Sequence, residues 1–314
     1  MRVGLVVDSA CDLPHSFIKE NDIYILPITA RFDGHTVVDD HDPEKTRSFF
    51  ESGLLDKGHL AETEAYSADQ IRRLFLDEIV TQYDFAFLET VTRSRSLIYQ
   101  NAWEAMTGVM AEYRQQRKMA GREGPFSMRV VDSGTLFAGQ GLLAAHTIHL
   151  IKQGIPKNEL RQRVESFVND IHLCVLPRDI YYIRQRARRR GDNSVSGVVA
   201  FLGKALNITP LIWGRGHIGG PVMKSRNFEA VVERTFDYAC RRIKAGLLSP
   251  YVCVSCGFPE EQIEALPGLD KLRDTCERHG VELLITQMGI TSSVYLGPGG
   301  LMLALAAPPH EFDD

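Results

Sequence analysis

Short apolar runs and amphipathic segments alternate along the first half of the chain. Residues 3–7, 85–91 and 128–131 are mainly apolar and too short for helices, so each predicts a buried strand. Apolar positions at helical spacing follow in residues 97–118 and in a segment that ends at Gly154. Strands that alternate with helices are typical of a mostly parallel sheet, so we expect an α/β fold here.

The second half begins after Gly154-Ile155-Pro156, where glycine and proline predict a boundary. A glycine-containing turn joins two strands, residues 208–213 and 218–223, in a hairpin that makes the second sheet mixed. We therefore predict two α/β domains, residues 1–155 and 156–314. Other helices are expected over residues 68–80, 156–170, 194–206, 260–279 and from Asn227 onward, and other strands over residues 172–176, 251–255, 281–286 and 301–306.

Composition and charge narrow the class of protein. The 314 residues are enough for two domains, and 44% hydrophobic with 24% charged residues is typical of a globular protein. A net charge of −4 gives no reason to expect nucleic-acid binding, and no apolar run approaches the roughly 18 residues of a membrane span. Asp8 interrupts the first apolar run, unlike a signal peptide, and six scattered cysteines predict no disulfide framework. We expect a cytoplasmic location.

Two motifs resemble metal sites in composition without having the spacing of one. Cys253 and Cys256 lie in a predicted strand, where they should point to opposite faces, and no second pair follows at zinc spacing. Residues 39–42 (Asp-Asp-His-Asp) lack the spacing of a calcium loop and are interpreted as a polar loop. No metal site is predicted.

Polar side chains follow each predicted strand of the first half. Right-handed crossovers bring the carboxyl ends of parallel strands to one edge, where open α/β sheets bind small ligands. The simpler alternative is that these side chains only satisfy backbone groups, and Asp12, a little further on, is expected to cap the next helix. The converging residues are Asp8 and Ser9, Thr92, Ser94 and Ser96, and Asp132 and Ser133.

Residues 92–96 form the strongest candidate site in this set. Hydroxyl and backbone N–H groups at a helix start favour an anion, and Arg93 and Arg95 add positive potential. A carboxylate or a phosphate would fit. The alternative is simple helix capping by Ser94 or Ser96.

Two further polar segments also have both a functional and a structural interpretation. Residues 63–67 can form a second hydroxyl loop, or Ser67 can simply cap the following helix. Arg184 begins a cluster of five arginines that ends at residue 190, and a solvated basic helix end is favoured over a phosphate-binding or partner-docking face. No phosphate-loop, dinucleotide-binding or nucleophile-elbow motif is present, so we assign no catalytic residues and favour binding over turnover.

The order of several short motifs resembles the DegV family over nearly the whole chain. Residues 8–14 (Asp-Ser-Ala-Cys-Asp-Leu-Pro) are similar to its opening Asp-Ser-x-x-Asp-Leu-Pro. Each motif is short, but their agreement in order and spacing makes the resemblance specific. The later matches are residues 96–102 (Ser-Leu-Ile-Tyr-Gln-Asn-Ala), 131–133 (Val-Asp-Ser), 139–141 (Gly-Gln-Gly), 202–210 (Leu-Gly through Asn-Ile-Thr-Pro) and 297–299 (Gly-Pro-Gly).

This resemblance implies a two-domain α/β protein that holds one long-chain fatty acid in a cleft between its domains, without a cofactor. Family members include the binding subunit of a bacterial fatty acid kinase, which presents the acyl carboxylate to a separate ATP-dependent kinase. Matched residue by residue, Ser96 would bind the carboxylate beside Thr63, and Arg184 would take part in phosphate transfer or kinase docking. The full set of expected ligand-binding residues is Asp8, Ser9, Thr63, Thr92, Ser94, Ser96 and Tyr295.

Two departures from the family pattern concern the ligand head group. Glu64 replaces a serine, and its carboxylate beside a bound carboxylate would repel it by about 1 kcal/mol or more. Tyr295 stands where many members have a histidine, so it offers a hydrogen-bond donor without positive charge. The acyl chain is expected to approach the helix after Asp132 at its small residues, which are Ala138, Gly139, Gly141, Ala144 and Ala145.

Two other functions use the same residues. An enzyme or sensor for a small phosphorylated metabolite would bind it at the same loops, with help from the arginine cluster. An RNA-associated protein would dock through residues 184–190, although the net charge argues against it. Binding of a phosphate ester but of no lipid would favour the first of these alternatives.

Overall fold

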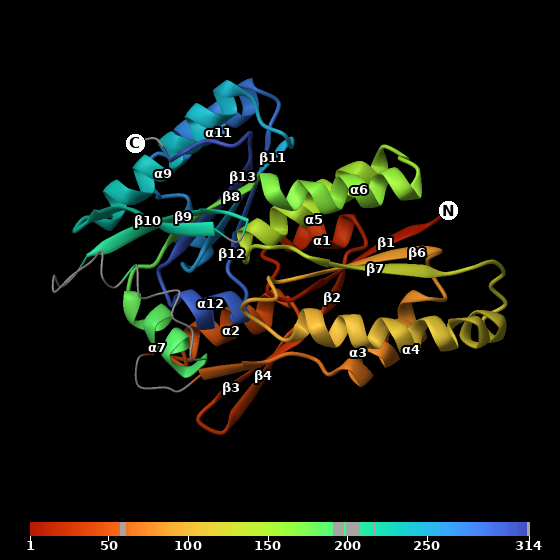
Figure 1. The fold of residues 1–314 in the computed structure, drawn as a ribbon. Coiled ribbons are helices and arrows are strands. Elements are labelled where there is room, and N and C mark those ends of the chain that lie inside the picture. The colour runs from red at the N-terminus through yellow and green to blue at the C-terminus, as the bar shows by residue number, and fades with distance from the viewer. Residues whose placement is uncertain (57–60, 191–197, 199–207, 217, 313–314) are drawn as a thin grey trace.

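The computed structural model describes residues 1–56, 61–190, 198, 208–216 and 218–312, which form three sheets with helices packed against them (Figure 1). Sheet A has the order β2-β1-β6-β7 and is parallel throughout, as the sequence predicts. Its apolar strands are buried because helices cover both faces. The strands are β1 (Val3–Asp8), β2 (Tyr24–Leu26), β6 (Phe85–Thr90) and β7 (Ser127–Asp132).

Sheet C is the mixed sheet predicted for the second half, and its order is β10-β9-β8-β13-β11-β12. Strands β11 and β12 pair in parallel, and the other described pairs are antiparallel. Cys253 and Cys256 face opposite sides of this sheet, as expected, and pack in different core clusters. The strands are β8 (Ile171–Leu176), β9 (Thr209–Arg215), β10 (Ile218–Ser225), β11 (Tyr251–Cys256), β12 (Glu282–Gln287) and β13 (Leu301–Ala306).

Sheet B is a small antiparallel sheet that the sequence analysis does not predict. Its order is β4-β3-β5, formed by β3 (Ile28–Phe32), β4 (His35–Asp39) and β5 (Ala61–Glu64). The helices α2 (Pro43–Glu51) and α12 (Ile290–Leu296) complete its core, in which Phe32, Phe49 and Val294 are buried. Sheet B, from the first half, therefore depends on a helix near the end of the chain.

Helices cover the larger sheets in layers (Figure 1). Helices α3 and α4 lie on one side of sheet A, α5 lies between sheets A and C, and α9 and α11 cover the other side of sheet C. The bounds are α1 (His15–Glu20), α3 (Ala68–Leu74, continuing as a π-helical segment Phe75–Ile79), α4 (Ile98–Met119), α5 (Ala138–Lys152), α6 (Lys157–Phe167, followed by a 3-10 turn Val168–Asp170), α7 (Ile180–Arg190), α9 (Phe228–Ala245), α10 (Glu260–Ile263) and α11 (Leu269–Arg278). None of these described helices is long and apolar enough to span a bilayer.

One predicted helix and one predicted helix cap are wrong. The helix predicted over residues 260–279 is two helices, α10 and α11, because Pro267 is followed by Gly268 with φ +81°, a left-handed conformation that interrupts the helix. Asp12 does not cap α1, whose first turn has no side-chain cap. The helix predicted over residues 194–206 lies outside the described residues, apart from Val198.

The small residues of α5 bring parts of the protein itself together. A Cβ atom on Gly139 would lie 2.1 Å from Thr135 Oγ1, and one on Gly141 would lie 2.3 Å from the Asp12 carbonyl oxygen. Helix α5 is buried between sheets A and C, and the expected acyl slot along it is wrong because protein atoms already occupy that space.

Replacing Gly141 by alanine is expected to destabilise the fold. The new Cβ would meet a backbone oxygen that cannot rotate away, so the free energy of unfolding should fall by about 1–3 kcal/mol or more. Urea unfolding followed by circular dichroism measures this. Gly220→Ala is the matched control, because nothing lies within 4 Å of its added Cβ, and a change of about 0.5 kcal/mol or less is expected. Equal effects of the two variants would contradict the tight contact.

Candidate functional site

The loops at the carboxyl ends of the sheet A strands meet, as expected from the parallel topology. The Asp8 carboxylate accepts hydrogen bonds from the backbone N–H groups of Val91 (2.7 Å) and Ala10 (3.0 Å). Asp132 likewise accepts from the Arg93 N–H (3.2 Å). These carboxylates hold the loop of residues 91–96 together with backbone hydrogen bonds, such as that from the Thr92 N–H to the Thr135 carbonyl oxygen (3.1 Å).

Asp8 and Ser9 lie behind the candidate site. Both are fully buried, and the Ser9 hydroxyl accepts a hydrogen bond from the Ile28 N–H (3.0 Å) and lies 3.4 Å from Thr291 Oγ1. Neither lines the cavities described below, whereas their neighbour Ala10 does. Both side chains accept hydrogen bonds from loop backbone groups, as the simpler of the two interpretations expects.

A small cavity of about 40 Å³ brings Thr63 and Ser96 together from separate parts of the fold. Apolar side chains form most of its wall, and hydroxyl groups and one guanidinium form the rest. We call it the head cavity. Its lining residues are Ala10, Ile28, Thr63, Ala65, Val91, Arg95, Ser96, Leu136, Phe137, Thr291, Val294 and Tyr295.

Ser96 caps the start of helix α4 and also lines the head cavity. Its Oγ accepts a hydrogen bond from the Ile98 N–H (3.2 Å) at the start of α4, so it does act as a local cap. A hydroxyl that accepts one hydrogen bond can still donate its own proton to another group. The positive end of the 22-residue helix α4 lies behind it and favours an anion.

Thr63 lies on strand β5, where it pairs with Ala30 of β3, and not in the loop that the sequence analysis expects. Alternation along a strand turns Thr63 and Ala65 toward the head cavity and Glu64 away from it. Glu64 is 59% exposed and forms an ion pair with Arg31. The repulsion expected between Glu64 and a bound carboxylate is therefore wrong, because this side chain is on the opposite face and is paired.

A larger cavity of about 250 Å³ adjoins the head cavity, with which it shares Arg95, Leu136 and Tyr295. We call it the tail cavity. Thr92 and Ser94, whose hydroxyls lie 3.3 Å apart, line it on the sheet A side. Its apolar wall comes from α7, sheet C and one further residue, and includes Leu173, Val175, Ile183, Val198, Ile212 and Trp213.

Arg95 lines both cavities, which could not be predicted from the sequence. It is half-buried, whereas Arg93 is 66% exposed and pairs with Asp132 (3.3 Å). The two arginines look equivalent in the sequence. Only the loop geometry distinguishes them, because it turns Arg93 toward Asp132 and Arg95 toward the two cavities.

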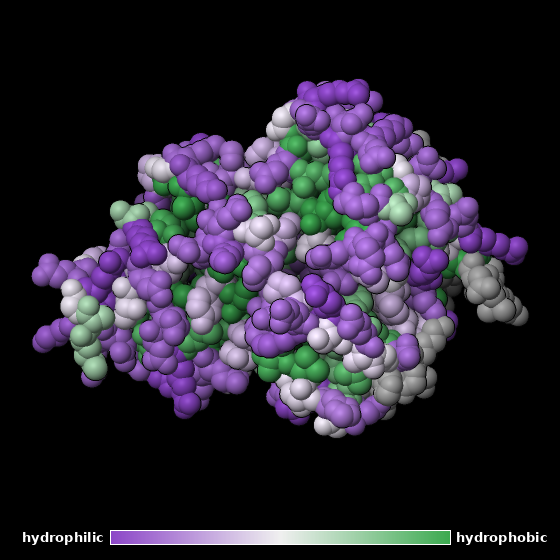
Figure 2. Space-filling model, turned by 180° about the vertical axis from the view of Figure 1, so that it is seen from behind, coloured by the Kyte–Doolittle hydropathy of each residue, from purple (hydrophilic) through white to green (hydrophobic). Residues whose placement is uncertain are grey.

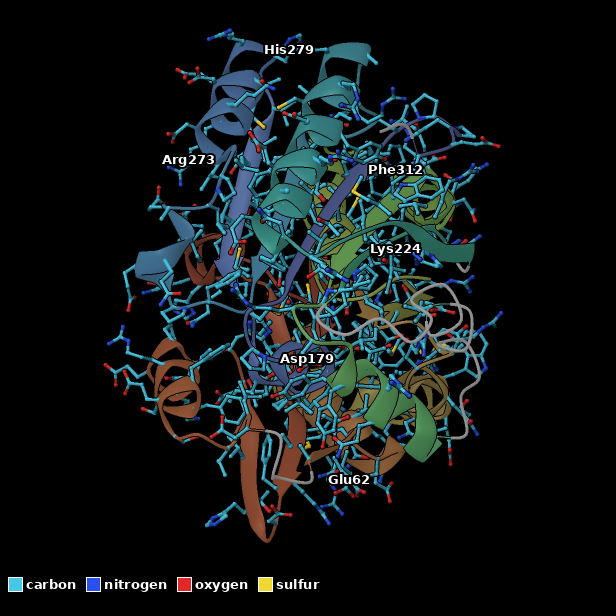
Figure 3. The ribbon with its side chains drawn as sticks, turned by 90° about the vertical axis from the view of Figure 1, so that its left-hand side faces the viewer. Glu62, Asp179, Lys224, Arg273, His279 and Phe312 are labelled. Carbon is cyan, nitrogen blue, oxygen red and sulfur yellow. The ribbon has the colours of Figure 1, made fainter. Side chains whose placement is uncertain are left out.

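Arg184 lies outside both cavities. It is exposed on α7, while its neighbour Ile183 is buried and lines the tail cavity. Helix α7 therefore presents one residue to the surface and its neighbour to the tail cavity. Figure 3 shows Asp179, just before α7, between Lys224 of sheet C above and Glu62 of sheet B below. The side chains of Arg186, Arg188, Arg189 and Arg190 lie outside the described structure.

Helix α12 carries Tyr295 into the cavities and is held by carboxylates from the other end of the chain. Asp12 is fully buried and accepts hydrogen bonds from the Gly289 N–H (3.0 Å), the Ser292 hydroxyl (2.7 Å) and the Ser255 hydroxyl (2.5 Å). Asp39 accepts from the Thr291 N–H (2.8 Å). Burial raises the pKa of Asp12 above its usual value. These carboxylates fix where Tyr295 stands.

The acidic residues 39–42 thus have structural partners. Asp39 holds α12, His41 Nε2 lies 2.9 Å from the Ser9 carbonyl oxygen, and Asp42 caps α2. Within the described ranges, no three His, Cys, Asp or Glu side chains are grouped so that they could hold a metal ion.

Glu89 is a buried acid near the end of β6. The Thr147 hydroxyl donates a hydrogen bond to its Oε1 (2.6 Å), and burial raises the pKa of Glu89 to about 8. Burial also raises the pKa of Asp8, to about 6, although its backbone hydrogen bonds oppose this. At neutral pH Glu89 is therefore mainly protonated, which limits the negative charge inside sheet A.

This geometry defines an α/β protein with two adjoining cavities, of which the smaller combines apolar walls with hydroxyl groups and one guanidinium. The profile of the DegV family, described as uncharacterised proteins, matches residues 2–307, and the chain belongs to that family. A DegV domain-containing protein of Xanthomonas axonopodis pv. citri is 41% identical over 312 residues, which is 99% of each chain. The family resemblance based on short motifs is confirmed.

Solved structures of the family share this fold. A stearic acid-binding protein of Eubacterium ventriosum superposes with a TM-score of 0.77 at 19% identity, over 97% of this chain and 98% of that one. A DegV family protein of Eubacterium eligens, loaded with heptadecanoic acid, superposes with a TM-score of 0.72 at 20% identity, over 97% and 99%. The α/β architecture with one parallel and one mixed sheet is confirmed.

The raised pKa of Glu89 predicts a specific dependence of stability on pH. A carboxyl group with a higher pKa in the folded state contributes stability that is complete below about pH 4.5 and is lost as the pH rises through about 8. Glu89→Gln should remove that loss. The free energy of unfolding of the parent should therefore fall, relative to that of the variant, by about 3–5 kcal/mol between about pH 4.5 and 8. Urea unfolding at several pH values measures it. Ionisation of Asp8 is largely complete above pH 6.5. Parallel plots of unfolding free energy against pH for parent and variant from pH 6.5 to 8 would contradict the raised pKa of Glu89.

Proposed function

We propose that this protein binds one long-chain fatty acid, with the carboxylate in the head cavity and the acyl chain in the tail cavity. The observation that carries the proposal is that Thr63 and Ser96 line one cavity, which adjoins an apolar one through Arg95 and Tyr295. Relatives of the same fold that hold stearic or heptadecanoic acid support it.

The polar groups of the head cavity suit a carboxylate. Thr63, Ser96 and Tyr295 can each donate a hydrogen bond, and Arg95 supplies positive charge at the junction of the two cavities. A hydrogen bond to a charged group contributes about 1.5–3 kcal/mol, so these donors select the acid over a neutral head group.

The apolar wall of the tail cavity supplies most of the expected affinity. Each buried CH₂ contributes about 0.8 kcal/mol, so a long chain outweighs the head group. The cavity volume of about 250 Å³ is somewhat below the ~300–1,000 Å³ usual for small-molecule sites. We propose that wall side chains from α7 and β9 shift outward as the chain enters.

We further propose a role as the substrate-presenting subunit of a fatty acid kinase, as the family resemblance implies. The carboxylate would lie beside Ser96, and a separate ATP-dependent kinase would dock over α7, where Arg184 is exposed. A cytoplasmic location goes with this role because ATP is the phosphate source.

The proposed domains, residues 1–155 and 156–314, are supported by the division of the strands, since those of sheets A and B precede Gly154 and those of sheet C follow it.

The apolar lining disfavours the alternative ligand, a small phosphorylated metabolite. Such a ligand would need several charged donors, whereas the lining residues of the head cavity include one guanidinium. Arg184, the other proposed phosphate ligand, lines neither cavity.

Removing the Ser96 hydroxyl is expected to weaken binding of stearic acid about tenfold to a hundredfold, the loss of one hydrogen bond to a charged group. Isothermal titration calorimetry on delipidated protein measures it. The methyl ester of stearic acid should bind the parent more weakly, and Ser96→Ala should not weaken it further. Ser166→Ala, at an exposed hydroxyl that bonds the Arg163 carbonyl oxygen, is the matched control. Equal affinity of parent and Ser96→Ala for the acid would disprove this carboxylate site.

Reversing the charge of Arg184 tests the kinase role separately. Arg184→Glu should leave stearic acid affinity unchanged, because this side chain lines neither cavity. It should lower acyl phosphate formation by an added fatty acid kinase with ATP at least tenfold. Arg163→Glu, at another exposed arginine, is the control and should retain activity. Full activity of Arg184→Glu would show that docking does not use this residue.

A further inference from the structure

Strand β12 forms one edge of sheet C, and a groove of about 820 Å³ runs along it. Helix α1 borders the groove on one side, and α10 and α11 border it on the other. Figure 2 shows the back of the molecule, where hydrophobic residues in the upper part are bordered by hydrophilic ones. Arg273 of α11, which lines the groove, is labelled at the left of Figure 3. Neither the head cavity nor the tail cavity includes a residue of β12.

The backbone of β12 offers unpaired groups to this groove. The Glu282 N–H donates to the Pro250 carbonyl oxygen (2.7 Å) and the Met288 N–H to that of Cys256 (2.8 Å), both on the β11 side. Alternation along the strand then turns the N–H and C=O groups of Leu283 and Ile285 and the N–H group of Gln287 to the open side, whereas the Gln287 carbonyl oxygen accepts a hydrogen bond from the Thr286 hydroxyl (3.1 Å). Among the described residues, β11 is the backbone partner of β12, so these groups form a template for another strand.

The two edges of sheet C differ in how they are protected. Strand β10, at the other edge, has an irregularity between Pro221 and Met223 and carries Lys224, all of which discourage pairing with another strand. Strand β12 pairs with β11 in unbroken register and has neither proline nor lysine in Glu-Leu-Leu-Ile-Thr-Gln. The β12 edge is thus the one that remains available for strand addition.

The charge of the groove identifies its partner. Five glutamates line it, and its single lining arginine, Arg273, already donates to both carboxylate oxygens of Glu264 (2.5 and 2.6 Å). An acidic groove attracts a basic segment, and it would repel the same groove of a second copy. The glutamates are Glu20, Glu260, Glu264, Glu277 and Glu282.

The groove continues into a wider cleft of about 850 Å³, with which it shares Glu260, Thr286 and Gln287. Phe50 of α2 and Phe258 supply apolar surface there. An extended chain of about 3.3 Å per residue that follows β12 would therefore pass on into this cleft.

We propose that β12 and its groove bind an extended, lysine- or arginine-rich segment of a partner protein, which adds as a strand to the edge of sheet C. Backbone hydrogen bonds to Leu283, Ile285 and Gln287 give affinity, and the surrounding glutamates give selectivity for positive charge. This surface is independent of the fatty-acid site.

The test uses two acetylated eight-residue peptides, one alternating Lys and Val and the other alternating Glu and Val. Fluorescence anisotropy should show binding of the Lys-Val peptide and at least tenfold weaker binding of the Glu-Val peptide. Ile285→Pro should weaken binding of the Lys-Val peptide at least tenfold, because it removes one outward N–H donor. The variant should still fold, because proline is tolerated on an edge strand whose N–H faces solvent. Ile285→Val keeps that N–H and should bind like the parent.

A second variant keeps the test valid if Ile285→Pro does not fold. Glu277→Lys with Glu282→Lys should lower the affinity for the Lys-Val peptide and raise it for the Glu-Val peptide. No binding of either peptide at millimolar concentration, equal binding of both, or unchanged binding by the folded variants would overturn the proposal. Dimers that sediment in the absence of peptide and are lost in Ile285→Pro would assign the edge to a second copy, and would also overturn it.

Discussion

The buried carboxylate of Asp12 joins the start of the chain to helix α12 near its end. It accepts hydrogen bonds from Gly289, Ser292 and Ser255, and Asp39 accepts another from Thr291. Helix α12 has seven residues and no side-chain cap of its own, so it is too short to be stable alone. A buried carboxylate without these donors would cost several kcal/mol, so the carboxylate and the helix each require the other.

Both the small sheet and the candidate site depend on that connection. The buried residues Ile290 and Val294 of α12 belong to the core of sheet B, and Thr291, Val294 and Tyr295 line the head cavity. Sheet B in turn carries Thr63. The distance between Thr63 and Ser96 is therefore set by a polar contact between distant parts of the chain, while each residue belongs to a different local structure. Ser96 takes its place from the end of sheet A, and Thr63 from a sheet that α12 supports.

The sequence pattern predicts those parts of the fold where periodicity and burial agree. The strands of sheet A are mostly apolar and buried, and the buried stripe of α4 (Ile98, Ala102, Ala105, Val109 and Tyr113) recurs at helical spacing. Strands β4 and β5 are mostly exposed and polar, so they have no comparable pattern. Helix α12 contains buried Thr291, Ser292 and Ser293, whose burial depends on partners that only the folded chain supplies. The glycines of α5 correctly indicate that other atoms approach this helix closely. The sequence does not show whether those atoms belong to a ligand or, as at Gly141, to Asp12.

The candidate site could be predicted in part for the same reason. Thr63 and Ser96 follow from the family motifs, whereas the orientation of Arg95 and Glu64 does not, because the direction of a side chain depends on the loop or strand that carries it. The result is a consistent electrostatic arrangement around the head cavity. Glu64 faces away and pairs with Arg31, and Asp132 pairs with Arg93.

Glu89 completes this arrangement from inside sheet A. Its pKa of about 8 keeps it mainly neutral at pH 7. Asp8, with a pKa of about 6, is mainly ionised at pH 7, but its carboxylate is held by the backbone N–H groups of Val91 and Ala10. Since like charges at short range repel strongly where water is scarce, the proposed anion site requires that the nearby acids be turned away, paired, protonated or bound by backbone donors in this manner.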